Sequence, residues 1–297
     1  MSIDLRGIIP PLVTPFTPEE EVDEDAVRGE VRFHLDRGVH GICVTGSTGE
    51  GASLLPEDAA KVARAAVKEA AGEAPVIAGV IRDSARDVIR YGRALREAGA
   101  DALQVTPVHY LFTPDADTTV AYYRRIAADV GLPVVIYNVV PWATIAPATI
   151  ARIMDKVPGV VAVKQSGGDI HALADLLHLA PRGGAVLTAV DDLLYPSFVL
   201  GAQGAIAATL TVAPSLCVEL WDAVRNGDHP AALRLHNRLL PVWRAIDGPN
   251  MPARIKAALA MQGRNGGLSR SPMSPVPEAE RAVIHDALRA ASVLGRS

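Results

Sequence analysis

Cysteine is scarce in this chain of 297 residues, which has only Cys43 and Cys217, both in apolar surroundings. Two cysteines without a Cys-x-x-Cys spacing argue against a disulfide framework and against a cysteine-ligated zinc site. We therefore expect two buried free thiols in a reducing compartment. The predicted strand ends also lack a His-x-x-x-His pair and a carboxylate cluster, so we expect no metal site.

Basic charge and long apolar runs are scarce as well. The 29 lysines and arginines are outnumbered by 33 aspartates and glutamates, which argues against nucleic acid as a partner. No uncharged apolar run reaches the roughly 18 residues that a membrane-spanning helix needs, so no membrane partner is expected. Residues 1–15 contain an acidic residue, an arginine and three prolines instead of a signal-peptide pattern. These absences predict a cytoplasmic protein.

Short apolar runs, in contrast, alternate regularly with longer amphipathic ones. The short runs are rich in Val, Ile and Ala with little polar alternation, which is typical of parallel strands covered on both faces. The predicted strands are residues 7–13, 41–45, 76–80, 102–106, 134–137, 160–164, 185–189 and 204–208. The predicted helices between them include residues 56–71, 84–98, 114–130 and 147–156, each with a serine or proline near its start.

Eight strands, each followed by a helix, predict the α/β class and a (β/α)8 TIM barrel. The alternative is an open doubly wound sheet, which would carry a glycine fingerprint after its first strand, where this chain has Pro10-Pro11-Leu12-Val13-Thr14-Pro15. The last predicted helices are residues 213–225, 230–246, 250–262 and 278–292, and residues 263–277 form a loop. We divide the chain into a barrel, residues 1–225, and a C-terminal helical appendage, residues 226–297.

The predicted sixth strand ends in Lys164, directly before the segment Gln165-Ser166-Gly167-Gly168. A lysine at the end of a buried strand loses its proton more readily than an exposed one, and a neutral amine attacks carbonyl carbons. Most lysines at strand ends are merely solvated, so this segment alone does not establish catalysis. In a barrel, however, strand ends converge on one mouth, where active sites lie.

Other polar side chains follow strands that would end at the same mouth. The second strand leads into Gly46-Ser47-Thr48-Gly49, the fourth into His109-Tyr110, and the fifth ends at Tyr137. Gly46-Ser47-Thr48-Gly49 could be an ordinary turn, since Ser, Thr and Gly are common in turns. It could also bind phosphate, although it lacks the lysine of a P-loop. Tyr137 could equally be a core residue whose hydroxyl reaches the rim. Three histidines in or beside helices are interpreted as solvated: His34, His40 and His171.

Taken together, Gly46-Ser47-Thr48-Gly49-Glu50, Tyr137-Asn138 and Val163-Lys164 resemble the dihydrodipicolinate synthase/N-acetylneuraminate lyase family. The resemblance runs from about residue 5 to residue 263. It implies a (β/α)8 barrel with C-terminal helices, assembled as a homotetramer that is a dimer of dimers. It also implies a class I aldolase or lyase that joins or cleaves a 2-keto acid such as pyruvate and an aldehyde, with no metal or organic cofactor.

The resemblance assigns roles to individual residues. Lys164 would form a Schiff base with the 2-keto group, and Tyr137 would shuttle protons as a general acid and base. Ser47 and Thr48, with nearby backbone amides such as that of Gly49, would bind the carboxylate of the 2-keto acid. One of the two hydroxyls would relay a proton to Tyr137.

Further positions line the predicted pocket or depart from the family pattern. Ile206 would lie beside the lysine, and Val190, where relatives often have glycine, could narrow the pocket. Trp142 stands near the place of an arginine that, in the synthases of lysine biosynthesis, binds the carboxylate of the aldehyde. A tyrosine that relatives lend to a neighbouring subunit aligns with His109, although Tyr110 is the next residue, so either could complete the proton relay.

An indole cannot make the bidentate carboxylate contact of an arginine. Trp142 therefore favours a neutral, less acidic or aromatic acceptor over the acceptor of an authentic 4-hydroxy-tetrahydrodipicolinate synthase. That synthase, a 2-keto-3-deoxy sugar acid aldolase, a dehydratase and a hydratase-aldolase for aromatic pyruvates remain alternatives within the enzyme class. Outside it, the alternative is a catalytically silent barrel that binds a small acid.

Overall fold

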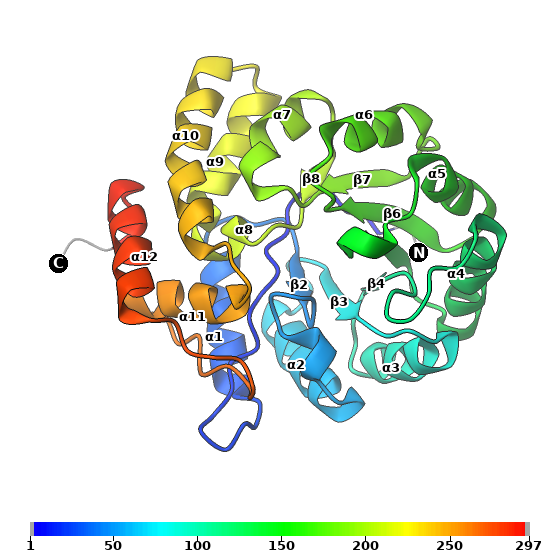
Figure 1. Cartoon of the computed structure of the whole chain (residues 1–297), viewed down its shortest axis with the longest axis horizontal. Coiled ribbons are helices and arrows are strands. Elements are labelled where there is room, and N and C mark those ends of the chain that lie inside the picture. Colours follow the sequence, from blue (N-terminus) through cyan, green and yellow to red (C-terminus); the bar gives the residue numbers. More distant parts are fainter. Residues whose placement is uncertain (1–2, 295–297) are drawn as a thin grey trace.

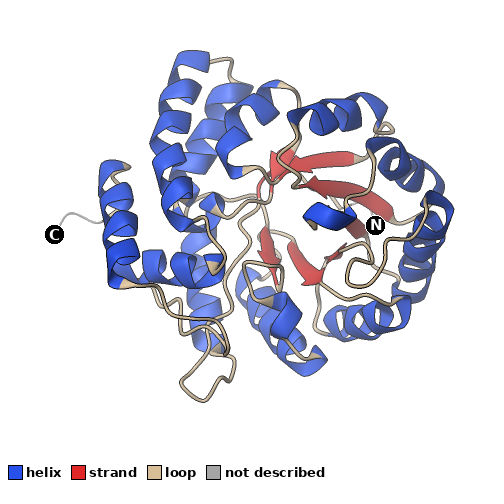
Figure 2. Cartoon of the chain, viewed as in Figure 1, coloured by secondary structure: helices blue, strands red, loops and turns tan. Residues whose placement is uncertain are grey.

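A computed structural model describes residues 3–294 of the chain. In this part of the protein, eight parallel strands form one sheet in the order β1-β8-β7-β6-β5-β4-β3-β2. A bridge between Pro11 and Cys43 joins the two ends of the sheet, which closes it into a barrel surrounded by helices (Figures 1 and 2). The strands are β1 (Gly7–Ile8), β2 (Ile42–Val44), β3 (Val76–Val80), β4 (Ala102–Val105), β5 (Val134–Asn138), β6 (Val160–Gln165), β7 (Ala185–Thr188) and β8 (Gly204–Ala205). The predicted TIM barrel is confirmed.

Helices alternate with the strands, and side-chain caps mark the starts of several of them. Asp23, Ser84 and Asp115 each accept a hydrogen bond from a backbone N–H in the first turn of the following helix. The barrel helices are α1 (Glu24–Leu35), α2 (Pro56–Ala70), α3 (Ala85–Glu97), α4 (Ala116–Val130), α5 (Pro147–Lys156), α6 (Ile170–Leu179), α7 (Leu194–Val199), α8 (Thr209–Val212) and α9 (Pro214–Arg225). Short 3-10 turns follow three strands: η1 (Gly51–Ser53), η2 (Pro141–Ala143) and η3 (Asp191–Leu193).

The first strand is much shorter than the predicted residues 7–13. Pro10 and Pro11 have no N–H to donate to a neighbouring strand, so regular pairing stops after Ile8. The chain nevertheless continues along the barrel wall, because Cys43 N donates to Pro10 O at 3.0 Å and Leu12 N donates to Cys43 O at 2.8 Å. The last strand is also shorter than predicted, since regular pairing ends at Ala205 and residues 206–208 lead into α8.

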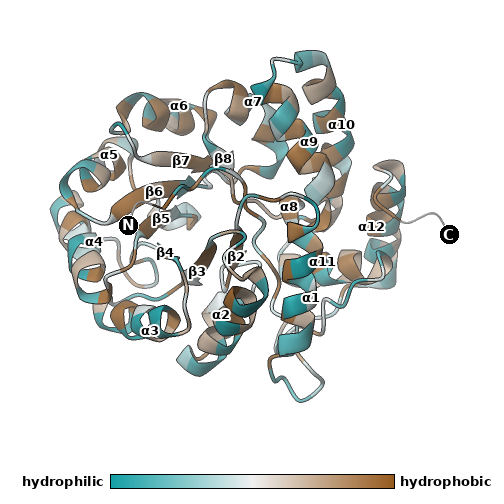
Figure 3. Cartoon of the chain, turned by 180° about the vertical axis from the view of Figure 1, so that it is seen from behind, coloured by the Kyte–Doolittle hydropathy of each residue, from teal (hydrophilic) through white to brown (hydrophobic). Residues whose placement is uncertain are grey.

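Apolar side chains fill two regions, one inside the barrel and one between the strands and the helices. Coloured by hydropathy, the strands are mostly apolar, and the surrounding helices mix apolar and polar residues (Figure 3). Both cysteines are buried and free, as expected from their apolar neighbours. Burial raises the pKa of the Cys43 thiol to about 11, so this thiol stays protonated at neutral pH.

The interpretation of His34 as solvated was wrong, because its side chain is completely buried on α1. Its Nδ1 lies 2.7 Å from Glu30 O, and its Nε2 lies 3.2 Å from Thr211 O. Burial lowers the pKa of His34 to about 3, which keeps the ring neutral. His40 is partly buried, with its Nδ1 accepting the Ile8 N–H at 3.2 Å.

Three further helices form the C-terminal appendage, α10 (His229–Ile246), α11 (Met251–Met261) and α12 (Glu278–Ala290). Residues 263–277 cross the surface as the predicted loop and pair back with the N-terminal region, where Phe16 N donates to Leu268 O at 3.2 Å. In Figure 1, α11 lies near α1, and α12 lies at the outer edge of the molecule, where it packs against α10 and α11. Among residues 3–294, no helix has the length and apolar character needed to cross a membrane.

Candidate active site

A pocket of about 330 Å³ opens at the carboxyl ends of the strands. Residues of the β2–α2 turn, the ends of β5 to β8 and the C-terminal appendage line it. Six of the predicted site residues lie there: Ser47, Thr48, Tyr137, Lys164, Val190 and Ile206. Within residues 3–294, no group of three or more His, Cys, Asp or Glu side chains is arranged to hold a metal ion.

Lys164 lies near the end of β6, with 6% of the residue exposed. The register of β5 and β6 places Tyr137 directly opposite Lys164, and paired residues point to the same face of a sheet. The Lys164 Nζ lies 4.3 Å from the centroid of the Tyr137 ring. The Tyr137 hydroxyl in turn lies 2.9 Å from the Ser47 hydroxyl. An amine, a phenol and an alcohol therefore form a connected group in one pocket.

The turn after β2 places Ser47 and Thr48 in this pocket because its backbone is tightly constrained. Gly49 lies behind the pocket wall, where its O accepts a hydrogen bond from Thr14 Oγ1 at 2.7 Å. A Cβ at Gly49 would lie 3.0 Å from Leu12 O, so a larger residue would displace the turn. Gly49 is thus close to the pocket without being one of its lining residues.

Asn138 and Gln165, the residues that follow Tyr137 and Lys164, form a buried pair of side-chain amides that does not line the pocket. Asn138 Nδ2 donates to Gln165 Oε1 at 2.8 Å, and Asn138 Oδ1 accepts the Ile145 N–H at 2.8 Å. These bonds fix the loop that follows β5. The Tyr137-Asn138 motif therefore combines one pocket residue with one residue that anchors the neighbouring loop.

Asp191 is a pocket residue that the sequence analysis did not select. It is buried, and its Oδ1 accepts hydrogen bonds from the N–H and the hydroxyl of Thr209, both at 2.6 Å. Burial raises the pKa of this carboxyl to about 6, although the Thr209 donors and the positive charge of Lys164 act in the opposite direction. Its position three residues after the end of β7 was the available signal, because a barrel's catalytic groups gather at the ends of the strands.

The mouth of the pocket is formed by residues of the appendage, which sequence patterns did not connect with the site. Arg244 of α10 pairs with Asp192 at 2.8 Å, and both side chains line the pocket. Trp243, Asp247 and Met251 complete this side. Their role depends on the packing of α10 against the barrel, which local sequence does not reveal.

Three predicted residues lie away from the pocket lining. His109 is held by Asp83, whose Oδ1 accepts the His109 N–H at 2.6 Å and lies 3.2 Å from its Nδ1. Tyr110 is 83% exposed, and Trp142 is 72% exposed. The Trp142 indole donates to His109 O at 2.9 Å, so the loops after β4 and β5 contact each other.

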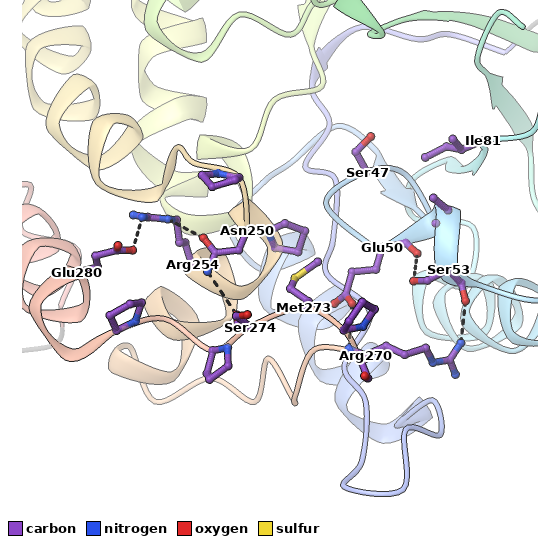
Figure 4. A pocket seen from close by; sticks show the side chains of 18 residues that line it. Ser47, Glu50, Ser53, Ile81, Asn250, Arg254, Arg270, Met273, Ser274 and Glu280 are labelled. Carbon is purple, nitrogen blue, oxygen red and sulfur yellow. Dashed lines mark hydrogen bonds and ion pairs between the residues drawn. The ribbon is translucent and has the colours of Figure 1, made fainter. Parts of the chain in front are cut away.

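A second pocket of about 930 Å³ lies next to the first, and Ser47 lines both. Its walls are the end of the β2–α2 turn and residues 249–280 of the appendage (Figure 4). Arg254 and Glu280 form an ion pair on the appendage side. Arg270 bonds to the turn on the other side.

Several known proteins resemble this chain over nearly its full length. The model of the dihydrodipicolinate synthetase family matches residues 4–291. The 4-hydroxy-tetrahydrodipicolinate synthase of Methylibium petroleiphilum is 35% identical, over 97% of this chain and 98% of that protein. The enzyme of the same name from Methanopyrus kandleri is 32% identical, over 99% of each. Among solved structures, the Escherichia coli K12 protein YagE in complex with pyruvate has a TM-score of 0.92 and 28% identity, covering 99% of this chain and 100% of that one.

Proposed function

Because the chain belongs to the dihydrodipicolinate synthetase family, a family of lyases of the class I pyruvate aldolase type, we propose that Lys164 forms a Schiff base with pyruvate or a related 2-keto acid. The observation that carries this proposal is the connected group of Lys164, Tyr137 and Ser47. The lysine is buried, the tyrosine ring lies 4.3 Å from its amine, and the serine hydroxyl is 2.9 Å from the tyrosine hydroxyl. An amine with an adjacent acid and base is the arrangement that covalent carbonyl chemistry needs.

The reaction begins when the Lys164 lone pair attacks the C2 carbonyl carbon and a C–N bond forms. Tyr137 donates a proton to the carbonyl oxygen, then takes one from the Lys164 nitrogen and passes it to the same oxygen, which leaves as water. The protonated Schiff base withdraws electrons from C3, so loss of a C3 proton gives an enamine. Tyr137 accepts the C3 proton and returns it to the aldehyde oxygen when the enamine carbon bonds to the aldehyde carbon. Water then adds to the protonated Schiff base, which releases the product and regenerates the lysine. Cleavage follows the same steps in reverse.

The remaining pocket residues bind and shape the substrate. The hydroxyls of Ser47 and Thr48 and the backbone amides near Gly49 bind the carboxylate of the 2-keto acid. Ser47 relays protons between Tyr137 and the substrate. Val190 and Ile206 supply apolar walls, and both line the pocket beside Lys164. Neither a metal ion nor an organic cofactor enters these steps, because the protonated imine is itself the electron sink.

For the second substrate we propose an aldehyde other than that of the 4-hydroxy-tetrahydrodipicolinate synthases. Two observations support this choice. Trp142 stands near the position where those synthases have an arginine, and its side chain is exposed outside the pocket. The Arg244 guanidinium at the mouth of the pocket is already paired with Asp192. Wild-type protein should condense aspartate semialdehyde with pyruvate poorly, and Trp142→Arg should improve that activity. Efficient condensation by the wild type would contradict this proposal.

We also propose that the protein acts in the cytoplasm as a homotetramer. Tyr110, Leu111 and Phe112 are 83%, 84% and 63% exposed, a run of apolar surface that monomers seldom display. A neighbouring copy packed on this loop would cover the run. His109 or Tyr110 would then complete the proton relay of the neighbouring pocket.

Borohydride trapping tests the covalent step directly. Wild-type protein incubated with pyruvate and borohydride should gain the mass of one reduced pyruvyl group, and Lys164→Ala should gain none. A silent small-acid-binding barrel would give no adduct in either protein, and its affinity for pyruvate would survive Lys164→Ala. Absence of a wild-type adduct with pyruvate and with longer 2-keto acids would refute the proposed function.

A further inference from the structure

The active-site turn, residues 45–53, is closed by hydrogen bonds of its own, such as Gly51 N to Gly46 O at 3.0 Å, yet it holds two non-glycine residues in a strained conformation. Thr45 and Glu50 have φ angles of 56° and 55°, in the left-handed region that non-glycine residues occupy only where surrounding contacts hold them. The two residues flank the segment that carries Ser47 and Thr48. Gly51 is equally constrained, since a Cβ there would lie 1.9 Å from Thr45 O. This turn needs contacts from outside to keep its shape.

The appendage supplies such contacts through the Glu50 carboxylate. Glu50 Oε1 accepts a hydrogen bond from Lys256 Nζ at 2.6 Å, and Oε2 accepts the Arg270 N–H at 3.0 Å. The Glu50 and Lys256 side chains are only 2% and 4% exposed. Lys256 also donates to Leu268 O at 2.6 Å and lies 4.8 Å from the centroid of the Phe16 ring. Burial lowers the pKa of Lys256, whereas the Glu50 charge favours its protonated form.

Arg270 secures the other end of the turn (Figure 4). Its Nη1 donates to Ser53 O at 3.1 Å and to Asp58 Oδ2 at 2.8 Å, which joins the turn to the start of α2. Its Nη2 donates to Glu20 O at 2.6 Å. One guanidinium therefore fixes the turn, a helix and the N-terminal loop relative to the appendage.

We propose that Lys256 and Arg270 are positioning residues for Schiff-base formation. The Lys256 amine and the Arg270 backbone N–H hold Glu50, and the Arg270 guanidinium holds Ser53, so that together they fix the turn that carries Ser47. We call Glu50, Lys256 and Arg270 the clamp. Glu50 is three residues from Ser47, and Glu50 N donates to Ser47 O at 3.1 Å. A displacement of Glu50 is thus transmitted to the Ser47 hydroxyl, 2.9 Å from that of Tyr137. The inference rests on the proposed function, because it gives the turn a role in that reaction.

The test compares the rate of the borohydride-trapped pyruvate adduct in wild-type protein and in Lys256→Met. The variant leaves Glu50 buried without its cation, and we expect adduct formation at saturating pyruvate to slow by about 10- to 100-fold, the range that a misplacement of about 1 Å causes. The melting temperature is measured in parallel. Arg254→Met is the control, because the Arg254 side chain is ion-paired and as exposed as that of Arg270, 14% against 15%, and its bonds go to Asn250, Ala245 and Glu280 within the appendage.

A double variant separates positioning from general stability. Glu50→Gln with Lys256→Met removes both buried charges, so its melting temperature should recover toward that of the wild type. The rate should stay low, because no ion pair holds the turn. A merely structural pair would instead give a rate that recovers with the melting temperature, and that result would overturn the proposal. A wild-type rate in Lys256→Met would do the same.

Amide hydrogen exchange of residues 46–53 provides a second readout. Exchange should accelerate in Lys256→Met and in Arg270→Met and should stay unchanged in Arg254→Met. Because exchange requires no catalysis, it tests the clamp even if pyruvate forms no adduct with the wild type, an outcome that would refute only the proposed function. Unchanged exchange in both clamp variants would refute the clamp while leaving the Schiff base intact.

Discussion

At the scale of single residues, burial in the pocket raises the pKa of the Asp191 carboxyl, although this group accepts two hydrogen bonds. Asp191 is buried beside Thr209, whose N–H and hydroxyl both donate to one carboxylate oxygen. Burial raises its pKa to about 6, within two units of neutrality. An acid of this strength can exchange protons near physiological pH. Asp191 and Lys164 line the same pocket.

The raised pKa of Asp191 predicts a pH-dependent stability. Folded protein binds this proton more tightly than unfolded chain, whose carboxyl has a pKa near 3.8, so the contribution of Asp191 to stability falls as pH rises from about 4 to 6. Asp191→Asn keeps an oxygen acceptor for Thr209 and cannot ionise. The variant should match the wild type near pH 4 and exceed it by roughly 2 to 3 kcal/mol at pH 8. Urea unfolding at both pH values measures this difference; a constant difference would contradict the assignment.

At the scale of elements, a buried ion pair attaches the appendage to the first helix. Arg264 Nε donates to Glu30 Oε1 at 3.1 Å, and its Nη1 donates to Thr211 O at 3.0 Å. The Arg264 guanidinium carbon lies 3.8 Å from the centroid of the Phe33 ring. Burial raises the pKa of Glu30, and Arg264 acts against that rise. The loop after α11 is therefore anchored to α1 as well as to the active-site turn.

Removing one partner of this pair should be costly. Arg264→Met leaves the Glu30 carboxylate buried without a cation, and we expect a loss of about 3 to 5 kcal/mol in the free energy of unfolding. Combining it with Glu30→Gln should restore most of that loss. Urea denaturation of the two variants decides the matter. A loss below about 1 kcal/mol in the single variant would indicate that the pair is dispensable.

The elements that sequence patterns located best are those with local signals. Residues 76–80 and 147–156 form the predicted strand and helix with the same bounds, because apolar runs and an initial proline define them. Prolines shortened β1, and their missing N–H groups could have been weighed from the sequence. The partners of Glu50 could not have been predicted from the sequence, because Lys256 and Arg270 reach Glu50 only through the packing of α11 and the loop that follows it. The burial of His34 was missed because it also depends on packing between distant segments, such as the contact of His34 with Thr211.

At the scale of the whole molecule, the loops after β4 and β5 form an exposed apolar surface. Tyr110, Leu111 and Phe112 belong to the first loop, and Trp142 of the second donates a hydrogen bond to His109 O. This hydrogen bond brings the two loops that carry the exposed side chains into contact. We expect a second copy of the chain to cover it.

Charges placed in this surface should dissociate the assembly. Leu111→Asp together with Phe112→Asp should lower the mass measured by analytical ultracentrifugation from that of a tetramer to that of a dimer or monomer, because the acidic groups would be desolvated at the interface. Val283→Asp is the control, since Val283 is 58% exposed on α12. A wild-type protein that sediments as a monomer would refute the proposed tetramer.

The distance along the chain between Glu50 and Lys256, 206 positions, has a consequence for synthesis on the ribosome. At about 5–20 residues per second, roughly 10–40 seconds pass between the addition of the two residues. During that interval the carboxylate lacks its cation, and β1 lacks its partner β8 until residues 204–205 are made. A nascent chain therefore carries Lys164 and Tyr137 well before the turn beside them is secured. If the clamp acts as proposed, we expect full reactivity toward 2-keto acids to arise only after Lys256 and Arg270 have been added to the growing chain.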